Sequence, residues 1–95
     1  MNPNYALAGK AVMVTGAGRS IGHAIARAFA AQGCRLLAAD RDAAALQSAK
    51  PAFSGAADVA TIACDLGHDA ELDQLRTATR TFSDRLDVLV NNAGV

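Results

Sequence analysis

Residues 12–30 read VMVTGAGRSIGHAIARAFA and hold the clearest structural signal in the chain. The stretch begins as a short apolar run typical of a buried strand and continues with apolar residues at helical spacing. Gly16, Gly18 and Gly22 stand where the strand would turn into the helix. Because glycine has no Cβ and adopts positive φ easily, such a turn is tight and lets a phosphate reach the backbone. We expect one glycine to make the turn, one to allow that approach and one to let helix and strand pack closely.

Apolar runs and helical patterns alternate along the rest of the chain. The expected strands are 10–15, 34–39, 59–64 and 86–90, the expected helices are 20–32, 42–50 and 69–82, and 51–57 is expected to be a loop. The first helix is expected to face the core with Ile21, Ala24, Ile25, Ala28 and Phe29. Asp42 is placed to cap the second helix. Strands that alternate with helices predict an α/β fold with a parallel sheet covered on both faces.

Composition excludes several classes of protein. The chain has 95 residues, with 9 Lys plus Arg against 9 Asp plus Glu, so its balanced charge argues against a nucleic-acid or anionic-membrane partner. Its apolar fraction of 52% is too high for a disordered chain. There is no apolar run of the ~18–20 residues that cross a bilayer, and the first residues lack a signal-peptide pattern. With Cys34 and Cys64 expected to be buried reduced thiols, a cytoplasmic location is predicted.

Asp40 ends the second expected strand, beyond the glycine cluster. A carboxylate at this point can accept hydrogen bonds from both hydroxyls of an adenosine ribose. Two less specific interpretations remain open: the glycines form an ordinary flexible loop, and Asp40 is a solvated acid or a cap at a strand end.

Three motifs together resemble the short-chain dehydrogenase/reductase family. They are Thr15-Gly16-Ala17-Gly18-Arg19-Ser20-Ile21-Gly22, then Asp65-Leu66 after the third strand, then Asn91-Asn92-Ala93-Gly94 after the fourth. The resemblance implies a Rossmann-like doubly wound sheet of strand order 3-2-1-4, with the first two helices on one face and the third on the other. It also implies hydride transfer between a nicotinamide dinucleotide and a carbonyl or alcohol substrate, and a homo-oligomer for a full-length member.

The resemblance implies a set of cofactor-binding residues. Gly16, Ser20, Ile21 and Gly22 would line the pyrophosphate, Asp40 the adenosine ribose, Asp65 and Leu66 the adenine, and Asn91, Ala93 and Gly94 the path toward the nicotinamide; Gly18, Arg19 and Arg41 complete the set. Ser20 departs from the family pattern, which has glycine there. Because serine disfavours positive φ, we expect Ser20 to adopt an ordinary helical conformation.

Cofactor choice rests on opposing charges. Asp40 would repel a 2′-phosphate, whereas Arg19 and Arg41 could each pair with one. Because a fixed like charge at the binding point should outweigh a mobile arginine, the sequence favours NAD over NADP.

No catalytic residue is assigned. The family's serine, tyrosine and lysine lie beyond the fourth strand, and Tyr5, the only tyrosine here, has Gly9 where the lysine would stand. Residues 1–95 are therefore expected to be the N-terminal part of a single NAD(P)-binding domain whose catalytic part is absent, and to be inactive alone. The alternatives are a non-catalytic dinucleotide sensor and a non-functional truncated product.

For the remaining candidate residues, the sequence indicates no specific chemistry. His23 is expected on a helix surface and His68 in a turn, and no His, Cys or acid cluster has metal-ligand spacing. The fourth strand should be an exposed sheet edge, so the isolated chain is predicted to be marginally stable and prone to associate.

Overall fold

The elements follow one another as the sequence predicts. The computed structural model describes residues 7–92, in the order β1 (Ala11–Thr15), α1 (Ser20–Ala30), β2 (Arg35–Asp40), α2 (Ala43–Ala49), the 3₁₀ helix η2 (Lys50–Phe53), β3 (Asp58–Ala63), α3 (Asp69–Phe82) and β4 (Val88–Asn91). Each expected strand and helix is present, with ends that differ by a few residues.

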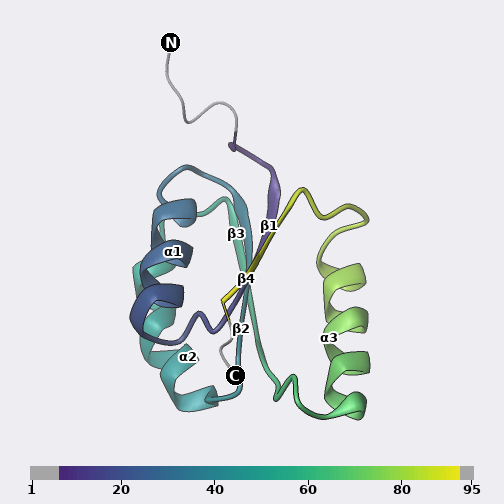
Figure 1. Cartoon of the computed structure of the whole chain (residues 1–95). Coiled ribbons are helices and arrows are strands. Elements are labelled where there is room, and N and C mark those ends of the chain that lie inside the picture. The colour runs from purple at the N-terminus through teal and green to yellow at the C-terminus, as the bar shows by residue number, and fades with distance from the viewer. Residues whose placement is uncertain (1–6, 93–95) are drawn as a thin grey trace.

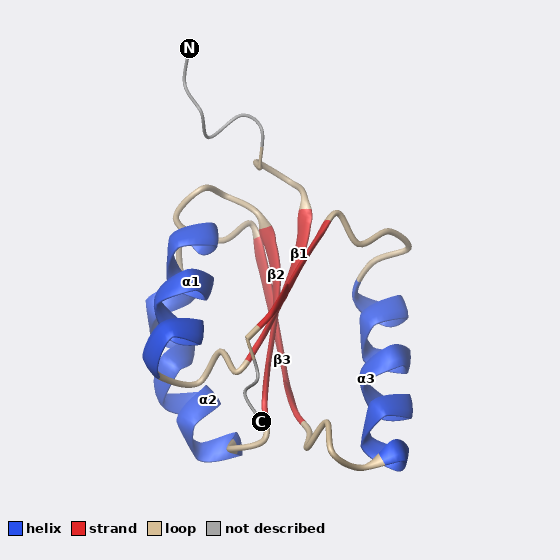
Figure 2. Ribbon diagram, viewed as in Figure 1, coloured by secondary structure: helices blue, strands red, loops and turns tan. Residues whose placement is uncertain are grey.

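The four strands form one parallel sheet in the order β3-β2-β1-β4. Figure 1 shows α1 and α2 together on one face of the sheet and α3 alone on the other, and Figure 2 shows the strands twisting across one another between these two layers. The predicted strand order and the predicted division of the helices are both confirmed. Strand ends from different parts of the chain thus meet at one edge, where Thr15 is level with Ala39 and Asn91.

The core lies on both faces of β1 and β2, because successive side chains of a strand point to opposite faces. Even-numbered residues pack toward α1 and α2, and odd-numbered residues pack toward α3. The first set includes Val12, Val14, Leu36 and Ala38, and the second includes Met13, Leu37 and Ala39 together with Leu75 of α3. All of β1 is buried, whereas β3 and β4 at the sheet edges are partly exposed. The expectation of strands covered on both faces therefore holds only for the central pair.

The buried face of α1 differs from the predicted one. Gly22, Ala26 and Ala30 are its fully buried residues, with Ile25 and Phe29 half-buried beside them, whereas Ile21 is 69% exposed and Ala24 and Ala28 are also exposed. A row of small side chains at four-residue spacing lets the helix axis approach the sheet, so the large apolar residues lie at the flanks of the contact. The predicted face, which began at Ile21, therefore lies one position too early in the sequence.

Residues 51–57 are not simply a loop. Lys50–Phe53 continues from α2 as a 3₁₀ helix, and Pro51 fits its first turn because that position needs no N–H donor. Phe53 is fully buried, and its ring centroid lies 5.6 Å from that of His23. His23 is consequently half-buried rather than a surface residue, and its Nδ1 has no hydrogen-bond partner among residues 7–92.

Both cysteines are buried and free. Burial raises the pKa of both thiols, and the carboxylates of Glu71, Asp65 and Asp40 raise that of Cys64 further. Among the described residues, no helix combines the length and the apolar character that a membrane span requires.

Candidate functional site at the carboxyl ends of the strands

The turn between β1 and α1 requires glycine at its first and last glycine positions. The first, Gly16, makes the turn, and the last, Gly22, allows a close packing contact. Gly16 has φ of +68°, which glycine adopts at little cost. A Cβ on Gly22 would lie 1.9 Å from the carbonyl oxygen of Gly16, so only glycine lets the helix start this close to the strand end. The turn therefore holds the N-terminus of α1 directly beside the end of β1.

Ser20 contradicts the sequence-based expectation for it. Its φ is +57°, the left-handed region, although a helical conformation was predicted. The reason lies in the turn: Arg19 just before it is extended, with φ −163° and ψ 170°, and the chain must reverse at residue 20 to enter α1. The backbone path thus demands the conformation that glycine supplies in the family pattern, and serine adopts it at a cost of about 1–2 kcal/mol.

Asp40 is turned toward the glycine turn. Its Oδ2 accepts a hydrogen bond from the Gly18 N–H at 2.9 Å, and its Oδ1 accepts one from the Asp42 N–H, also at 2.9 Å. The side chain is buried, with the residue only 9% exposed. A Cβ on Gly18 would lie 2.9 Å from Oδ2 and from the Cβ of Ala45, so Gly18 is needed for the approach of Asp40 and α2.

The N-terminus of α1 is the helix start best suited to an anion. It has no capping side chain and no acidic residue in its first turn. By contrast, Asp42 caps α2 through the Ala45 N–H, as predicted, and α3 begins with Asp69 and Glu71 in its first turn. Among the three described α-helices, α1 alone therefore keeps both its first-turn N–H groups and its positive dipole end without an acidic neighbour.

A cavity of about 480 Å³ opens at the carboxyl ends of the strands, a size typical of small-molecule sites. It is lined by Thr15, Gly16, Arg19, Ala39, Asp40, Arg41, Cys64, Asp65, Leu66, Gly67 and Asn92. Of the predicted cofactor residues, the structure brings together Gly16, Arg19, Asp40, Arg41, Asp65 and Leu66. Gly18, Ser20, Ile21, Gly22 and Asn91 lie outside this lining, and Ala93 and Gly94 lie outside the described residues.

Sequence reasoning missed the contribution of Thr15 and Asn92 to the cavity wall. The Thr15 hydroxyl donates to Asn91 Oδ1 at 3.2 Å and accepts from the Asn92 N–H at 3.0 Å. Because Thr15 and Asn91 are paired in the register of β1 and β4, the two motifs that contain them meet at one place. The adjacent strands 1 and 4 in the expected sheet order were the signal that could have revealed this contact.

Two arginines contribute guanidinium groups to the cavity wall. Arg19 belongs to the glycine turn and Arg41 follows β2, and both line the cavity. The Arg19 guanidinium lies 3.3 Å from Asp42 Oδ2, and its side chain is 62% exposed. The wall thus combines two guanidinium groups with the carboxylates of Asp40 and Asp65.

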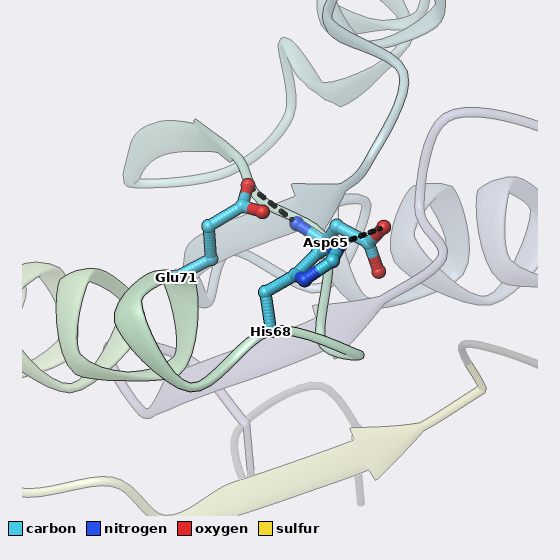
Figure 3. Close-up of side chains that lie close together, drawn as sticks. All are labelled: Asp65, His68 and Glu71. Carbon is cyan, nitrogen blue, oxygen red and sulfur yellow. Dashed lines mark hydrogen bonds and ion pairs between the residues drawn. The ribbon is translucent and has the colours of Figure 1, made fainter.

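The turn after β3 gathers three side chains that sequence spacing did not suggest as a group. Asp65, His68 and Glu71 place one ligand-type atom each within 4.8 Å of one another. Figure 3 shows the three side chains lying close together. His68, which the sequence places in a turn, lies at the N-cap of α3.

Comparison with known proteins places the chain among its relatives. The family described as short chain dehydrogenase matches residues 10–95. The chain belongs to this family. It is 39% identical over 94 residues to the rhamnolipids biosynthesis 3-oxoacyl-[acyl-carrier-protein] reductase of Pseudomonas aeruginosa. These aligned residues make up 99% of this chain and 37% of the reductase.

Solved structures of short-chain dehydrogenases share the fold. The Pseudomonas aeruginosa RhlG/NADP active-site complex superposes with a TM-score of 0.87 at 39% identity, over 100% of this chain and 38% of that one. L-sorbose reductase from Gluconobacter frateurii, complexed with NADPH and L-sorbose, gives 0.86 at 30% identity over 94% and 35%. The chain thus spans little more than a third of the length of these short-chain dehydrogenases.

Proposed function

We propose that residues 1–95 are the cofactor-binding part of an NADP(H)-dependent oxidoreductase of the short-chain dehydrogenase family. The observation that carries the proposal is the cavity at the carboxyl ends of a 3-2-1-4 parallel sheet, beside the glycine turn and the start of α1. In open α/β sheets this crevice is where ligands bind. The polar groups of the site also fit a dinucleotide. Helix N–H groups can hold phosphate, and carboxylates and guanidinium groups can bind a substituted ribose.

Each part of the dinucleotide is assigned to a set of residues at the site. The pyrophosphate would lie against the first turn of α1, held by N–H groups and by the helix dipole. The adenosine ribose would lie between Arg41 and Arg19, and the adenine beside Asp65 and Leu66. Gly18, Ser20 and Gly22 would then act through backbone position, because their contribution is the shape of the turn.

The choice of NADP reverses the preference that the sequence alone favours. That preference rested on repulsion between Asp40 and a 2′-phosphate. In the structure both carboxylate oxygens of Asp40 accept backbone N–H groups, from Gly18 and Asp42, so the carboxylate is held against the glycine turn. Arg19 and Arg41 stand on the cavity wall, where a 2′-phosphate would find two guanidinium partners. Related solved structures that are complexes with NADP or NADPH support the same choice.

The chemistry proposed for the whole protein is hydride transfer between a carbonyl or alcohol carbon and a bound nicotinamide. The nicotinamide would give or take the hydride. The residues of this chain bind and orient the dinucleotide. The proton-transfer groups of the family belong to sequence beyond its fourth strand. The names of the related proteins point to different substrates, 3-oxoacyl-[acyl-carrier-protein] for one and L-sorbose for another, so no substrate is assigned from them.

Fluorescence titration of the purified chain with NADPH and with NADH tests the proposal. We expect NADPH to bind more tightly, and Arg41→Ala to weaken NADPH by about tenfold, the effect of one charge-assisted contact, while changing NADH little. Arg27→Ala is the matched control, because Arg27 is an exposed arginine in the last turn of α1, away from the cavity lining. Equal affinity for both cofactors would overturn the choice of NADP, and binding of neither would overturn the dinucleotide site itself.

A further inference from the structure

Asp65, His68 and Glu71 converge from the turn after β3 and the first turn of α3. The carboxylate Oδ2 of Asp65 lies 3.5 Å from Nε2 of His68, and a ligand-type atom of Glu71 lies within 4.8 Å of both. Figure 3 shows the imidazole beside the Asp65 carboxylate, with Glu71 reaching back from the helix toward the same turn. The Asp65 carboxylate thus faces the imidazole, while the Glu71 carboxylate bonds to the backbone of the same turn.

Local hydrogen bonds orient two of these side chains. Asp65 Oδ1 accepts from the Gly67 N–H at 2.9 Å, and Glu71 Oε1 accepts from the Asp65 N–H, also at 2.9 Å. Each bond uses one carboxylate oxygen and leaves the second, Oδ2 or Oε2, for another partner. Backbone partners of this kind are the supporting contacts that fix metal ligands in position.

We propose that Asp65, His68 and Glu71 form a binding site for a transition-metal dication of the Zn²⁺ type. Two ligand atoms of a tetrahedral Zn²⁺, each about 2.0–2.1 Å from the ion, are about 3.3 Å apart, close to the Asp65–His68 separation. An imidazole with two carboxylates suits Zn²⁺ rather than Mg²⁺ or Ca²⁺, which prefer oxygen ligands alone. A water would complete the fourth position.

The charges around the three ligands favour the binding of a cation. The N-terminal dipole of α3 opposes it, an effect of about 0.3–1 kcal/mol at exposed sites. Asp69 in the same first turn opposes that dipole, and no salt bridge within the described residues brings an arginine or lysine to the three ligands. The site remains accessible, because the His68 side chain is 69% exposed and that of Asp65 is 44% exposed.

Occupancy of this site would act on the cavity, because Asp65 belongs to both. A bound ion fixes the Asp65 carboxylate toward His68 and places positive charge at the adenine end of the cavity. We expect the ion and the dinucleotide to bind antagonistically, each weakening the other by the same factor. This consequence rests on the proposed function, whereas the metal site itself does not.

Calorimetric titration of the nucleotide-free chain with Zn²⁺ tests the site. We expect one ion per chain, with affinity reduced at least tenfold in His68→Gln. His68 makes no capping bond and is exposed, so this variant keeps the fold, which circular dichroism checks. The matched control Asp73→Asn removes an exposed carboxylate from the same helix, outside the cluster, and should bind Zn²⁺ as the parent chain does.

The outcomes separate the metal site from its coupling to the nucleotide. Absence of Zn²⁺ binding, or equal binding to His68→Gln, would overturn the site; a signal lost only in Cys64→Ser would assign the ion to the thiol instead. NADPH titration at saturating Zn²⁺ should show severalfold weaker binding in the parent chain and no change in His68→Gln. NADPH binding that ignores Zn²⁺ would overturn the antagonism alone, and failure of NADPH to bind without Zn²⁺ would overturn the proposed function alone.

Discussion

Ser20 shows how one residue can conflict with the path of its own backbone. The turn from β1 into α1 requires a left-handed conformation at this position, and Ser20 adopts it with φ of +57°. The side chain is exposed, and nothing in the described structure rewards serine over glycine there. The strain is therefore a cost borne by the folded state, and sequence reasoning missed it by applying serine's own preference rather than that of the turn.

Replacing Ser20 with glycine should stabilise the chain by about 1 kcal/mol, because relief of the left-handed strain exceeds the added entropy of the unfolded state. Urea unfolding followed by circular dichroism measures this difference. The same substitution at Ser48, an exposed residue within α2, should destabilise by about 0.5 kcal/mol, because glycine is the poorer helix former. A loss of stability in Ser20→Gly would show that the serine side chain does stabilise the turn.

At the scale of elements, the sequence predicted what depends on local pattern. Apolar runs located the strands, and the sheet order followed from the family resemblance. Phe53 was missed because one aromatic between Pro51 and Gly55 carries no periodicity, and its burial depends on the position of α1. The same difference applies to the site. The sequence motifs located Gly16 and Asp65, but the orientation of the Asp40 side chain depends on its hydrogen bond to Gly18, which lies on a different loop.

Asp87 joins the segment before β4 to the start of β1 and should make stability depend on pH. Its Oδ2 accepts the Ala11 N–H at 2.9 Å, and this bond, together with Arg85 and Lys10 nearby, lowers the pKa of the carboxyl below its ordinary value of 3.8 despite an opposing effect of burial. A carboxyl whose pKa is lower in the folded state stabilises the fold above its unfolded pKa. That stabilisation is lost as the pH falls through the lower, folded value.

Asp87→Asn should therefore lower the melting temperature at pH 7. The difference from the parent chain should begin to shrink below about pH 4, where the unfolded chain binds the proton, and should disappear once the pH falls below the lower, folded pKa. Thermal unfolding at pH 7 and at pH 3 compares the two. Asp84→Asn, which changes an exposed acid in the same segment, should leave both melting temperatures nearly unchanged. A difference that stays constant with pH would mean that Asp87 contributes through its shape rather than its charge.

At the scale of the whole molecule, the sheet is covered unevenly. α1 and α2 cover one face, and α3 alone covers the other (Figure 1). Leu89 of β4 is paired with Met13 of β1 and so shares its face, yet Leu89 is 56% exposed while Met13 is 7% exposed. β4 is also an edge strand in the described sheet, with β1 as its one neighbour. Backbone groups along such an edge can pair with a second chain, and an apolar side chain beside them strengthens the contact.

The isolated chain should consequently associate through β4, and Leu89→Lys should reduce that association, because a lysine beside an open edge opposes strand pairing. Sedimentation velocity across a range of concentrations measures the effect as a shift toward monomer. Ile21→Lys is the matched control: it adds the same charge at a residue that is 69% exposed but lies on α1, away from the edge. If Ile21→Lys suppresses association as strongly as Leu89→Lys, general apolar exposure drives it; a parent chain that stays monomeric at all concentrations would mean that the open edge alone does not recruit a partner.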